Sequence, residues 1–324
     1  MFTLAELDAA QNLVSRFVPP TPALDWPLLA QALGARQVIV KHENHAPTGA
    51  FKVRGGVTFM DWLRREHPEL QGIVTATRGN HGQSQARAAT ALGLRAKVLV
   101  PRGNSVEKNA AMRAYGAELV EFGADFDEAR EEAMRLAEAE PLYPVPPFHR
   151  ELVRGVATYG LEMFRAHPDL ERVYVPIGCG SGLCGVIAAR DALGLRCEVV
   201  GVVATAADGA LQSVREGRLI ATDSAHTFAD GIAVRVPVAE AYAIYATGAH
   251  HLGAVTDQAI AAAMRLYFTA THNLAEGAGA AALALAMQEK DDLRGRKVGL
   301  VLSGCNIDRP LYAEVLAGGT PVVA

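Results

Sequence analysis

The chain contains few cysteines, few aromatic residues and no long apolar run. Four of its 324 residues are cysteine, namely Cys179, Cys184, Cys197 and Cys305, and no C-x-x-C pair occurs. This pattern argues against a disulfide framework and indicates the reduced thiols of a cytoplasmic protein. The most apolar segment, residues 278–287, is about half as long as the roughly 20 residues that span a bilayer. A membrane-spanning protein is therefore not expected.

Basic residues form no block along the chain. The formal net charge is −4, the pI is about 6.2, and aromatic residues make up 6% of the sequence. These values argue against a surface that binds nucleic acid or anionic lipid. No positively charged region followed by an apolar stretch opens the sequence, so no signal peptide is predicted. A length of 324 residues favours about two globular domains.

Short β-rich runs alternate with longer helical patterns. Several of the expected strands are continuously apolar, as strands buried on both faces are. This alternation predicts the α/β class, with parallel sheets that carry helices on both faces. The expected strands are residues 38–41, 73–76, 97–100, 119–122, 172–175, 198–203 and 298–302, and the expected helices include 83–92, 106–115, 127–139, 183–193 and 256–269.

A proline-rich stretch at residues 141–147, PLYPVPP, is interpreted as a linker. It predicts a small α/β domain over residues 72–146 and a large domain formed by residues 1–71 plus 147–324, each with its own parallel-type sheet. His250 and His251 are expected on a solvated loop.

Lys52 lies within the run TGAFKVRGG at residues 48–56, between a glycine turn and the expected start of a helix. A lysine held there can be partly desolvated, and burial favours the neutral amine that attacks carbonyl compounds. A surface lysine on an amphipathic helix is the alternative for this run alone.

A glycine-rich turn, GCGSGL at residues 178–183, follows an expected strand and precedes a helix. Its backbone N–H groups, the Ser181 hydroxyl and the helix N-terminus favour an anion such as phosphate. The turn lacks the Gly-Lys-Ser/Thr ending of a P-loop. A plain tight turn remains the alternative.

Two further turns directly follow expected strands. Residues 77–83, TRGNHGQ, offer amide and backbone donors that suit a carboxylate, although Thr77 or Asn80 could be ordinary helix caps. Residues 303–306, SGCN, lie at a strand's C-terminal end, where ligands of open α/β sheets gather.

These motifs, together with residues 228–234, FADGIAV, occur in the order found in pyridoxal-phosphate enzymes of the tryptophan-synthase-β type, also called fold type II. The chain most resembles the serine/threonine dehydratase family, which is related to serine racemase, and the resemblance covers nearly its whole length. It implies pyridoxal 5'-phosphate as the cofactor, held in the cleft between the two domains. An amino-acid substrate and a homodimer are also implied.

The resemblance further implies individual residue roles. Lys52 would form the Schiff base with the cofactor and act as the base at the substrate Cα, and Ser303 would face the pyridine nitrogen. The other implied cofactor-binding residues are Phe51, Asn80, Gly178, Cys179, Gly180, Ser181, Gly182 and Glu276, and the implied substrate-binding residues are Thr77, Arg78, Asn80 and His81.

The predicted reaction is the removal of water from a β-hydroxy amino acid such as threonine or serine, giving a 2-keto acid and ammonia. A serine hydroxyl is too weak an acid to protonate the pyridine nitrogen, which favours prompt β-elimination over transamination. Serine racemisation or β-replacement on the same scaffold is one alternative. A nucleotide-binding protein without catalysis is another, and the missing P-loop counts against it.

Some positions depart from the family pattern. Arg78 stands where serine racemase has a serine that reprotonates the substrate, and an arginine is a poor proton shuttle. Its charge would instead suit an unusual β-substituent, as in 3-hydroxyaspartate, unless it turns outward; phenylserine is a further candidate. His149 and Arg150 also depart from the family. Asp208 alone is a poor ligand set for a hard cation, so no metal site is predicted.

Overall fold

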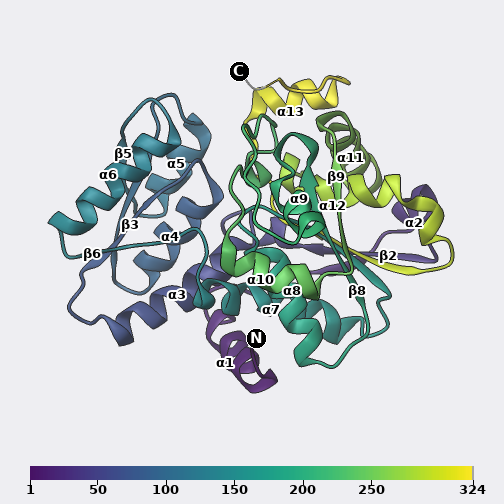
Figure 1. Cartoon of the computed structure of the whole chain (residues 1–324), viewed down its shortest axis with the longest axis horizontal. Helices are drawn as coiled ribbons and strands as arrows, with labels where there is room; N and C mark the ends of the chain where they lie inside the picture. Colours follow the sequence, from purple (N-terminus) through teal and green to yellow (C-terminus); the bar gives the residue numbers. More distant parts are fainter. Residues whose placement is uncertain (323–324) are drawn as a thin grey trace.

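The computed structural model describes residues 1–322, which form two sheets wrapped by helices (Figure 1). The larger sheet has the strand order β1-β2-β10-β7-β8-β9, and the smaller has the order β5-β4-β3-β6. Every pairing is parallel except that of β1 with β2. The strands are β1 Ala23–Asp25, β2 Gln37–His42, β3 Gly72–Ala76, β4 Arg95–Val100, β5 Glu118–Glu121, β6 Leu142–Pro144, β7 Arg172–Pro176, β8 Glu198–Ala204, β9 His251–Val255 and β10 Lys297–Leu302.

Helices cover both faces of each sheet. Successive residues of a strand point to opposite faces, and the central strands are apolar at successive positions, so both faces must be buried. In the part of the chain described, the α-helices are α1 Leu4–Val14, α2 Pro27–Leu33, α3 Lys52–Glu66, α4 Asn80–Ala91, α5 Val106–Ala114, α6 Phe126–Ala139, α7 Arg150–Ala166, α8 Ser181–Ala192, α9 Gly209–Glu216, α10 Ala239–Gly248, α11 Asp257–Thr271, α12 Gly277–Gln288 and α13 Arg309–Leu316. Short 3₁₀ helices are η1 Glu43–His45, η2 Thr205–Ala207, η3 Asp230–Ile232 and η4 Lys290–Leu293.

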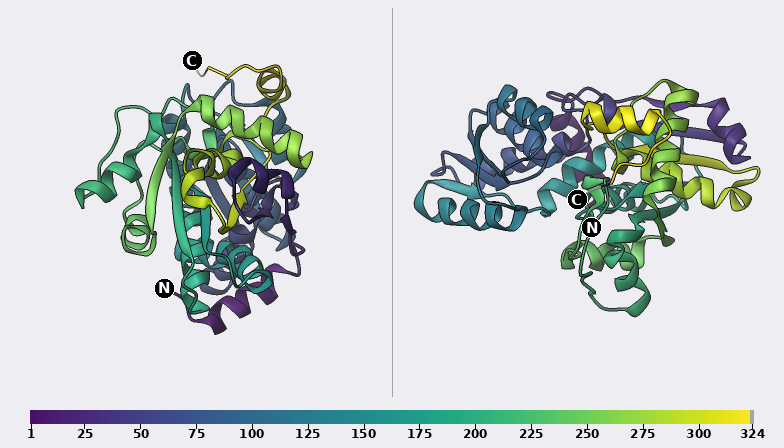
Figure 2. Two further views of the ribbon diagram at one scale, coloured as in Figure 1. Left: turned by 90° about the vertical axis from the view of Figure 1, so that its right-hand side faces the viewer. Right: turned by 90° about the horizontal axis from the view of Figure 1, so that it is seen from above.

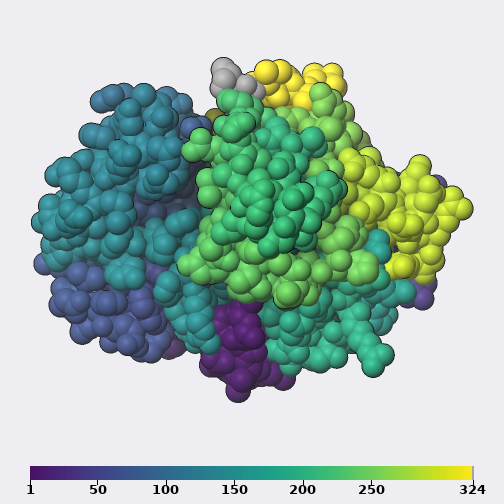
Figure 3. Space-filling view, in the orientation of Figure 1, coloured from purple at the N-terminus to yellow at the C-terminus, as the bar shows by residue number. Residues whose placement is uncertain are grey.

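The larger sheet separates two apolar cores. Helices α2, α11 and α12 pack on one face with Val40 and Leu300, whereas α7, α8 and α10 pack on the other with Ile39 and Val301. In the smaller sheet, α6 covers the face of Val74, and α3 and α4 cover the opposite face. The part that carries the smaller sheet, drawn blue to teal, lies beside the rest of the chain (Figure 2, right, and Figure 3). No helix among residues 1–322 has both the length and the apolar character needed to cross a membrane.

The predicted α/β class, with two mostly parallel sheets, is confirmed. All strands of the smaller sheet fall between Gly72 and Pro144, inside the predicted small domain. The domain boundaries themselves stay a prediction.

Two local predictions were wrong. The proline-rich stretch is not simply a linker, because it contains β6, which pairs with β3 at the edge of the smaller sheet. An edge strand tolerates proline, since one side of its ladder needs no N–H donors. His251 is not on a loop either: it begins edge strand β9, and its Nε2 lies 2.8 Å from Glu289 Oε1.

Candidate active site

The turn before Lys52 is held against the end of β10. The N–H of Phe51 donates to the carbonyl oxygen of Ser303 at 3.1 Å, and the N–H of Cys305 donates to that of Gly49 at 2.9 Å. Gly49 has φ +67°, a left-handed conformation that favours glycine. Two of the motifs found in the sequence, about 250 residues apart, therefore form one structural unit that places Lys52 at the start of α3.

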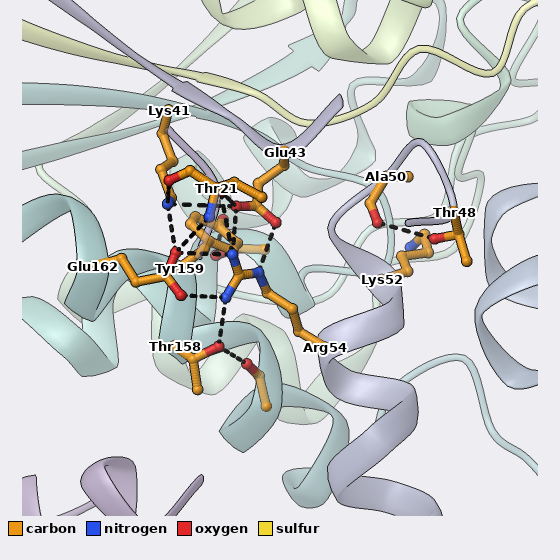
Figure 4. A network of polar contacts seen from close by, with 12 residues as sticks. Thr21, Lys41, Glu43, Thr48, Ala50, Lys52, Arg54, Thr158, Tyr159 and Glu162 are labelled. Atoms are coloured by element: carbon orange, nitrogen blue, oxygen red, sulfur yellow. Dashed lines mark hydrogen bonds and ion pairs between the residues drawn. The ribbon is translucent and has the colours of Figure 1, made fainter. Parts of the chain in front are cut away.

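The opposite side of α3 is fastened by a buried ion cluster (Figure 4). Arg54, fully buried, donates to Glu43 at 2.8 Å and to Glu162 at 2.7 Å. Lys41 bonds the second oxygen of Glu162 and the carbonyl oxygen of Thr21. Because residues two apart point in nearly opposite directions from a helix, Arg54 holds the helix from behind while Lys52 projects away from the cluster.

The charges within this cluster compensate one another. Burial alone would lower the pKa of Arg54, but the carboxylates of Glu43 and Glu162 outweigh it and raise that pKa. Burial is also the largest influence on Glu162, and there the two cations prevail and lower the pKa. The pKa of Lys41 is lowered, mainly by burial. The cluster thus carries two cations and two carboxylates, a balance that buried charges need.

The glycine-rich turn connects β7 to α8. Gly180 has φ +97°, and a Cβ there would come within 2.6 Å of Ala241 Cβ, so only glycine fits without displacement. Helix α8 begins at the next residue, Ser181, and its first N–H groups have no partner within the helix. The turn therefore presents backbone donors and a helix N-terminus at the C-terminal edge of the larger sheet, which is an anion-binding arrangement.

The turn after β3 brings Asn80 to the same place from the smaller sheet. Asn80 is the first residue of α4, and its Nδ2 donates to Glu276 Oε1 at 2.7 Å. Its Oδ1 accepts from Asn306 Nδ2, also at 2.7 Å. The Thr77 hydroxyl accepts the N–H groups of Gly79 and Gly82, so it stabilises this turn.

Glu276 is a buried carboxyl with an incomplete set of partners. Its Oε2 is buried and makes no hydrogen bond within residues 1–322. Burial first, and the negative charge of Asp230 second, raise the pKa of Glu276 to about 7. Lys108 of α5 opposes this rise and forms an ion pair with Asp230. The pKa of Glu276 therefore depends on two charged groups from distant parts of the chain, Lys108 of α5 and Asp230 of η3.

One pocket collects most of the predicted site. It is lined by all ten residues expected to bind the cofactor, together with Pro176, Gly231, Ile232 and Ala278. The ten are Phe51, Lys52, Asn80, Gly178, Cys179, Gly180, Ser181, Gly182, Glu276 and Ser303. Their individual roles stay predictions.

Three predicted substrate residues do not line this pocket: Thr77, Arg78 and His81. Arg78 is exposed and forms no ion pair with any residue up to position 322. The Nε2 of His81 is buried without a partner there, and burial, with the charge of Lys52, lowers the pKa of His81 to about 3. A neutral imidazole at this position can serve as either donor or acceptor.

His149 and Arg150 lie outside the pocket that contains Lys52. His149 caps α7 and its ring lies 4.7 Å from the ring of Trp62, while Arg150 pairs with Glu6. Both residues line a second pocket beside the N-terminus.

A family model described as "Pyridoxal-phosphate dependent enzyme" matches residues 14–304. The chain belongs to the pyridoxal-phosphate-dependent enzyme family. The L-threonine ammonia-lyase of Thermotoga maritima is 33% identical over 98% of this chain and 79% of its own length. The L-threo-3-hydroxyaspartate ammonia-lyase of Saccharomyces cerevisiae is 29% identical over 98% of this chain and 97% of its own.

A solved structure agrees with this membership. The processed form of threonine deaminase isoform 2 from Solanum lycopersicum has a TM-score of 0.90 at 29% identity, covering 98% of this chain and 90% of that one. The cofactor is therefore pyridoxal phosphate. The pocket fits it, because Lys52, the buried Ser303 and a glycine turn at a helix N-terminus line it together.

Sequence reasoning missed Asn306 and Lys108 as members of the site. Asn306 was visible as the last residue of the SGCN motif, but nothing local showed its bond to Asn80. Lys108 sits in an ordinary helical pattern, and only the packing of α5 near Asp230 reveals it. Among the described residues, no group of three or more His, Cys, Asp or Glu side chains is placed to hold a metal ion.

Proposed function

We propose that the protein is an ammonia-lyase that removes water from a β-hydroxy amino acid of the threonine or serine type, giving a 2-keto acid and ammonia. The observation that carries the proposal is the single pocket shared by Lys52, Ser303, Asn80 and the glycine turn. Similarity to the Thermotoga maritima L-threonine ammonia-lyase over nearly the whole chain supports it.

The proposed roles follow from position. Backbone N–H groups of residues 178–182 hold the cofactor phosphate, Phe51 lines the ring and Ser303 faces the pyridine nitrogen. When bound, pyridoxal phosphate supplies an electron-withdrawing ring conjugated to the substrate nitrogen, which acidifies the Cα–H bond. The Lys52 amine takes this proton as a general base.

The remaining residues bind the substrate carboxylate. The N–H groups at the start of α4 face it, and the neutral His81 ring lies in the same turn, while the Asn80 amide of this turn contacts the cofactor. The β-hydroxyl departs as water with the proton that left Cα, and the released enamine then tautomerises and hydrolyses in solution to the keto acid and ammonia.

An assay of keto acid and ammonia across a panel of β-hydroxy amino acids tests this function. We expect turnover of threonine, serine or a close analogue, and at least a thousandfold loss in Lys52→Ala, because the base is absent. Keto-acid formation at the wild-type rate by Lys52→Ala would overturn the proposal. Formation of D-serine without keto acid would instead identify a racemase.

A second candidate substrate is 3-hydroxyaspartate. Arg78 follows Thr77 in the turn after β3, is exposed and has no ion-pair partner in the described chain, so its guanidinium is free to pair with a second carboxylate. Similarity to the Saccharomyces cerevisiae L-threo-3-hydroxyaspartate ammonia-lyase supports this candidate. Arg78→Gln should then raise KM for 3-hydroxyaspartate about tenfold and leave KM for serine unchanged; equal effects on both would exclude it.

We further propose a cytoplasmic homodimer, as the family resemblance implies. The four free cysteines are consistent with a reducing compartment. Sedimentation equilibrium tests the dimer.

A further inference from the structure

Asn306 touches two parts of the site at once. Its Nδ2 donates to the carbonyl oxygen of Thr48 at 2.8 Å and to Asn80 Oδ1 at 2.7 Å. Thr48 belongs to the turn that precedes Lys52, and Asn80 belongs to the turn after β3. Asn306 therefore links the lysine turn of the larger sheet to the asparagine of the smaller one.

The direction of these bonds is determined by the Thr48 carbonyl. A carbonyl oxygen only accepts, so the Asn306 atom facing it is the NH₂ group. That same NH₂ group faces Asn80, which must present its oxygen to it. The NH₂ group of Asn80 is thereby turned toward Glu276 Oε1 at 2.7 Å. One of its two N–H bonds is used there, and one is left for the pocket that Asn80 lines.

Gly49 gives Asn306 the room to lie in this position. A Cβ on Gly49 would come within 2.8 Å of Asn306 Oδ1. The glycine of the lysine motif is thus required by its φ of +67° and by the amide that lies against it.

We propose that Asn306 is a positioning residue that fixes the orientation of the Asn80 amide, so that a donor and not an acceptor faces the bound cofactor. Without it, Asn80 can rotate by half a turn with little change in shape, since the two ends of an amide are nearly equal in size. The proposal rests on the proposed contact between Asn80 and the cofactor. Asn306 acts through Asn80 and touches no reacting atom.

The test uses the full-length enzyme, stripped of cofactor and titrated with pyridoxal 5'-phosphate. Asn306→Ser removes the amide NH₂ group and leaves a hydroxyl on a side chain that is one bond shorter, and we expect Kd for the cofactor to rise roughly tenfold. Asn306→Asp keeps the size but cannot donate as a carboxylate, so Asn80 turns its NH₂ group to it and its oxygen toward Glu276. We expect a larger loss for Asn306→Asp than for Asn306→Ser.

The matched control is Asn104→Ser. It removes the donor of another asparagine–asparagine bond of 2.7 Å, from Asn104 to Asn109, outside the pocket. We expect it to change Tm of the apoprotein about as much as Asn306→Ser while leaving Kd for pyridoxal phosphate unchanged. A purely structural role of Asn306 would make the two variants alike in Kd as well, and would overturn the proposal.

A double-mutant cycle with Asn80→Ala decides between direct and indirect action. If Asn306 acts through Asn80, then Asn306→Ser should add nothing to the loss already caused by Asn80→Ala. If the increases in Kd of the two single variants multiply in the double variant, the two residues act independently and the proposal is overturned. Wild-type affinity for the cofactor in Asn306→Asp would also overturn it. An unchanged Kd in Asn80→Ala overturns the positioning role together with the cofactor contact of Asn80, whereas the lyase function is decided separately by the keto-acid assay.

Discussion

Replacing Arg54 by methionine is expected to destabilise the protein strongly. Arg54 donates to Glu43, Glu162, Thr21 and Thr158, and its side chain is fully buried. Its removal leaves Lys41 facing two carboxylates, so the cluster changes from neutral to a net charge of −1. Removing one partner of a buried ion pair costs about 3–5 kcal/mol, a large part of the roughly 5–15 kcal/mol by which a domain is stable.

The pH dependence of this loss has a definite sign. In the wild type the pKa of Glu162 is lowered, so its contribution to stability is present above the unfolded value and disappears as the pH falls. In Arg54→Met one buried carboxylate has no cation partner, so its pKa rises. The free-energy cost of burying that charge disappears when the carboxylate takes up a proton. The stability difference between wild type and variant should therefore narrow from pH 8 to pH 5.

Urea unfolding followed by tryptophan fluorescence measures both effects. Arg65→Met is the matched control, because Arg65 lies on the same helix and its ion pair with Asp61 is exposed, so a loss below about 1 kcal/mol is expected. Adding Glu43→Gln to Arg54→Met should recover part of the lost stability, since one cation and one carboxylate then remain. The reasoning is refuted if Arg54→Met destabilises no more than Arg65→Met.

Two further predictions concern the pocket. Gly180→Ala should raise Kd for pyridoxal phosphate at least tenfold, because the new methyl group meets Ala241; Gly194→Ala, also at positive φ but with open space around it, should leave Kd unchanged. The raised pKa of Glu276 means that its contribution to stability is present below about pH 4.5 and is lost as the pH rises through about 7. Lys108→Met removes a charge that lowers this pKa, so in urea titrations of the apoprotein the decrease in stability with rising pH should continue to higher pH, by roughly one unit. Glu276→Gln should abolish this pH-dependent decrease in stability. An unchanged pH profile in Glu276→Gln would contradict the assignment.

The pocket was largely predictable because its pieces are local. The turns at Lys52, Asn80, Gly180 and Ser303 each occupy a strand-to-helix junction or a strand end, and such positions meet at one edge of a parallel sheet. In each motif, glycine and other small residues predict the turn from the sequence alone. The fold class followed from the same alternation of strands and helices.

The remaining features depend on partners far along the chain. In the sequence Arg54 has the appearance of a surface charge on a helix, and only the fold brings Glu43 of η1 and Glu162 of α7 to it. Lys108 gives no local sign of its pairing with Asp230, 122 positions later. Strands β1, β6 and β9 were missed because edge strands are short and partly exposed, so polar residues and proline are tolerated there.

The position of β10 determines when the site can come into existence. This strand is the last of those found in residues 1–322, yet it lies between β2 and β7 in the middle of the larger sheet, and the turn that follows it carries Ser303 and Asn306. A chain emerging from the ribosome has made nine strands before the one that joins the two halves of that sheet. The lysine turn cannot dock until β10 is inserted, because Phe51 bonds the carbonyl of Ser303. Long-range pairings of this kind form late in folding, so a nascent chain should acquire its cofactor only after β10 and the turn that follows it, up to Asn306, have been synthesised.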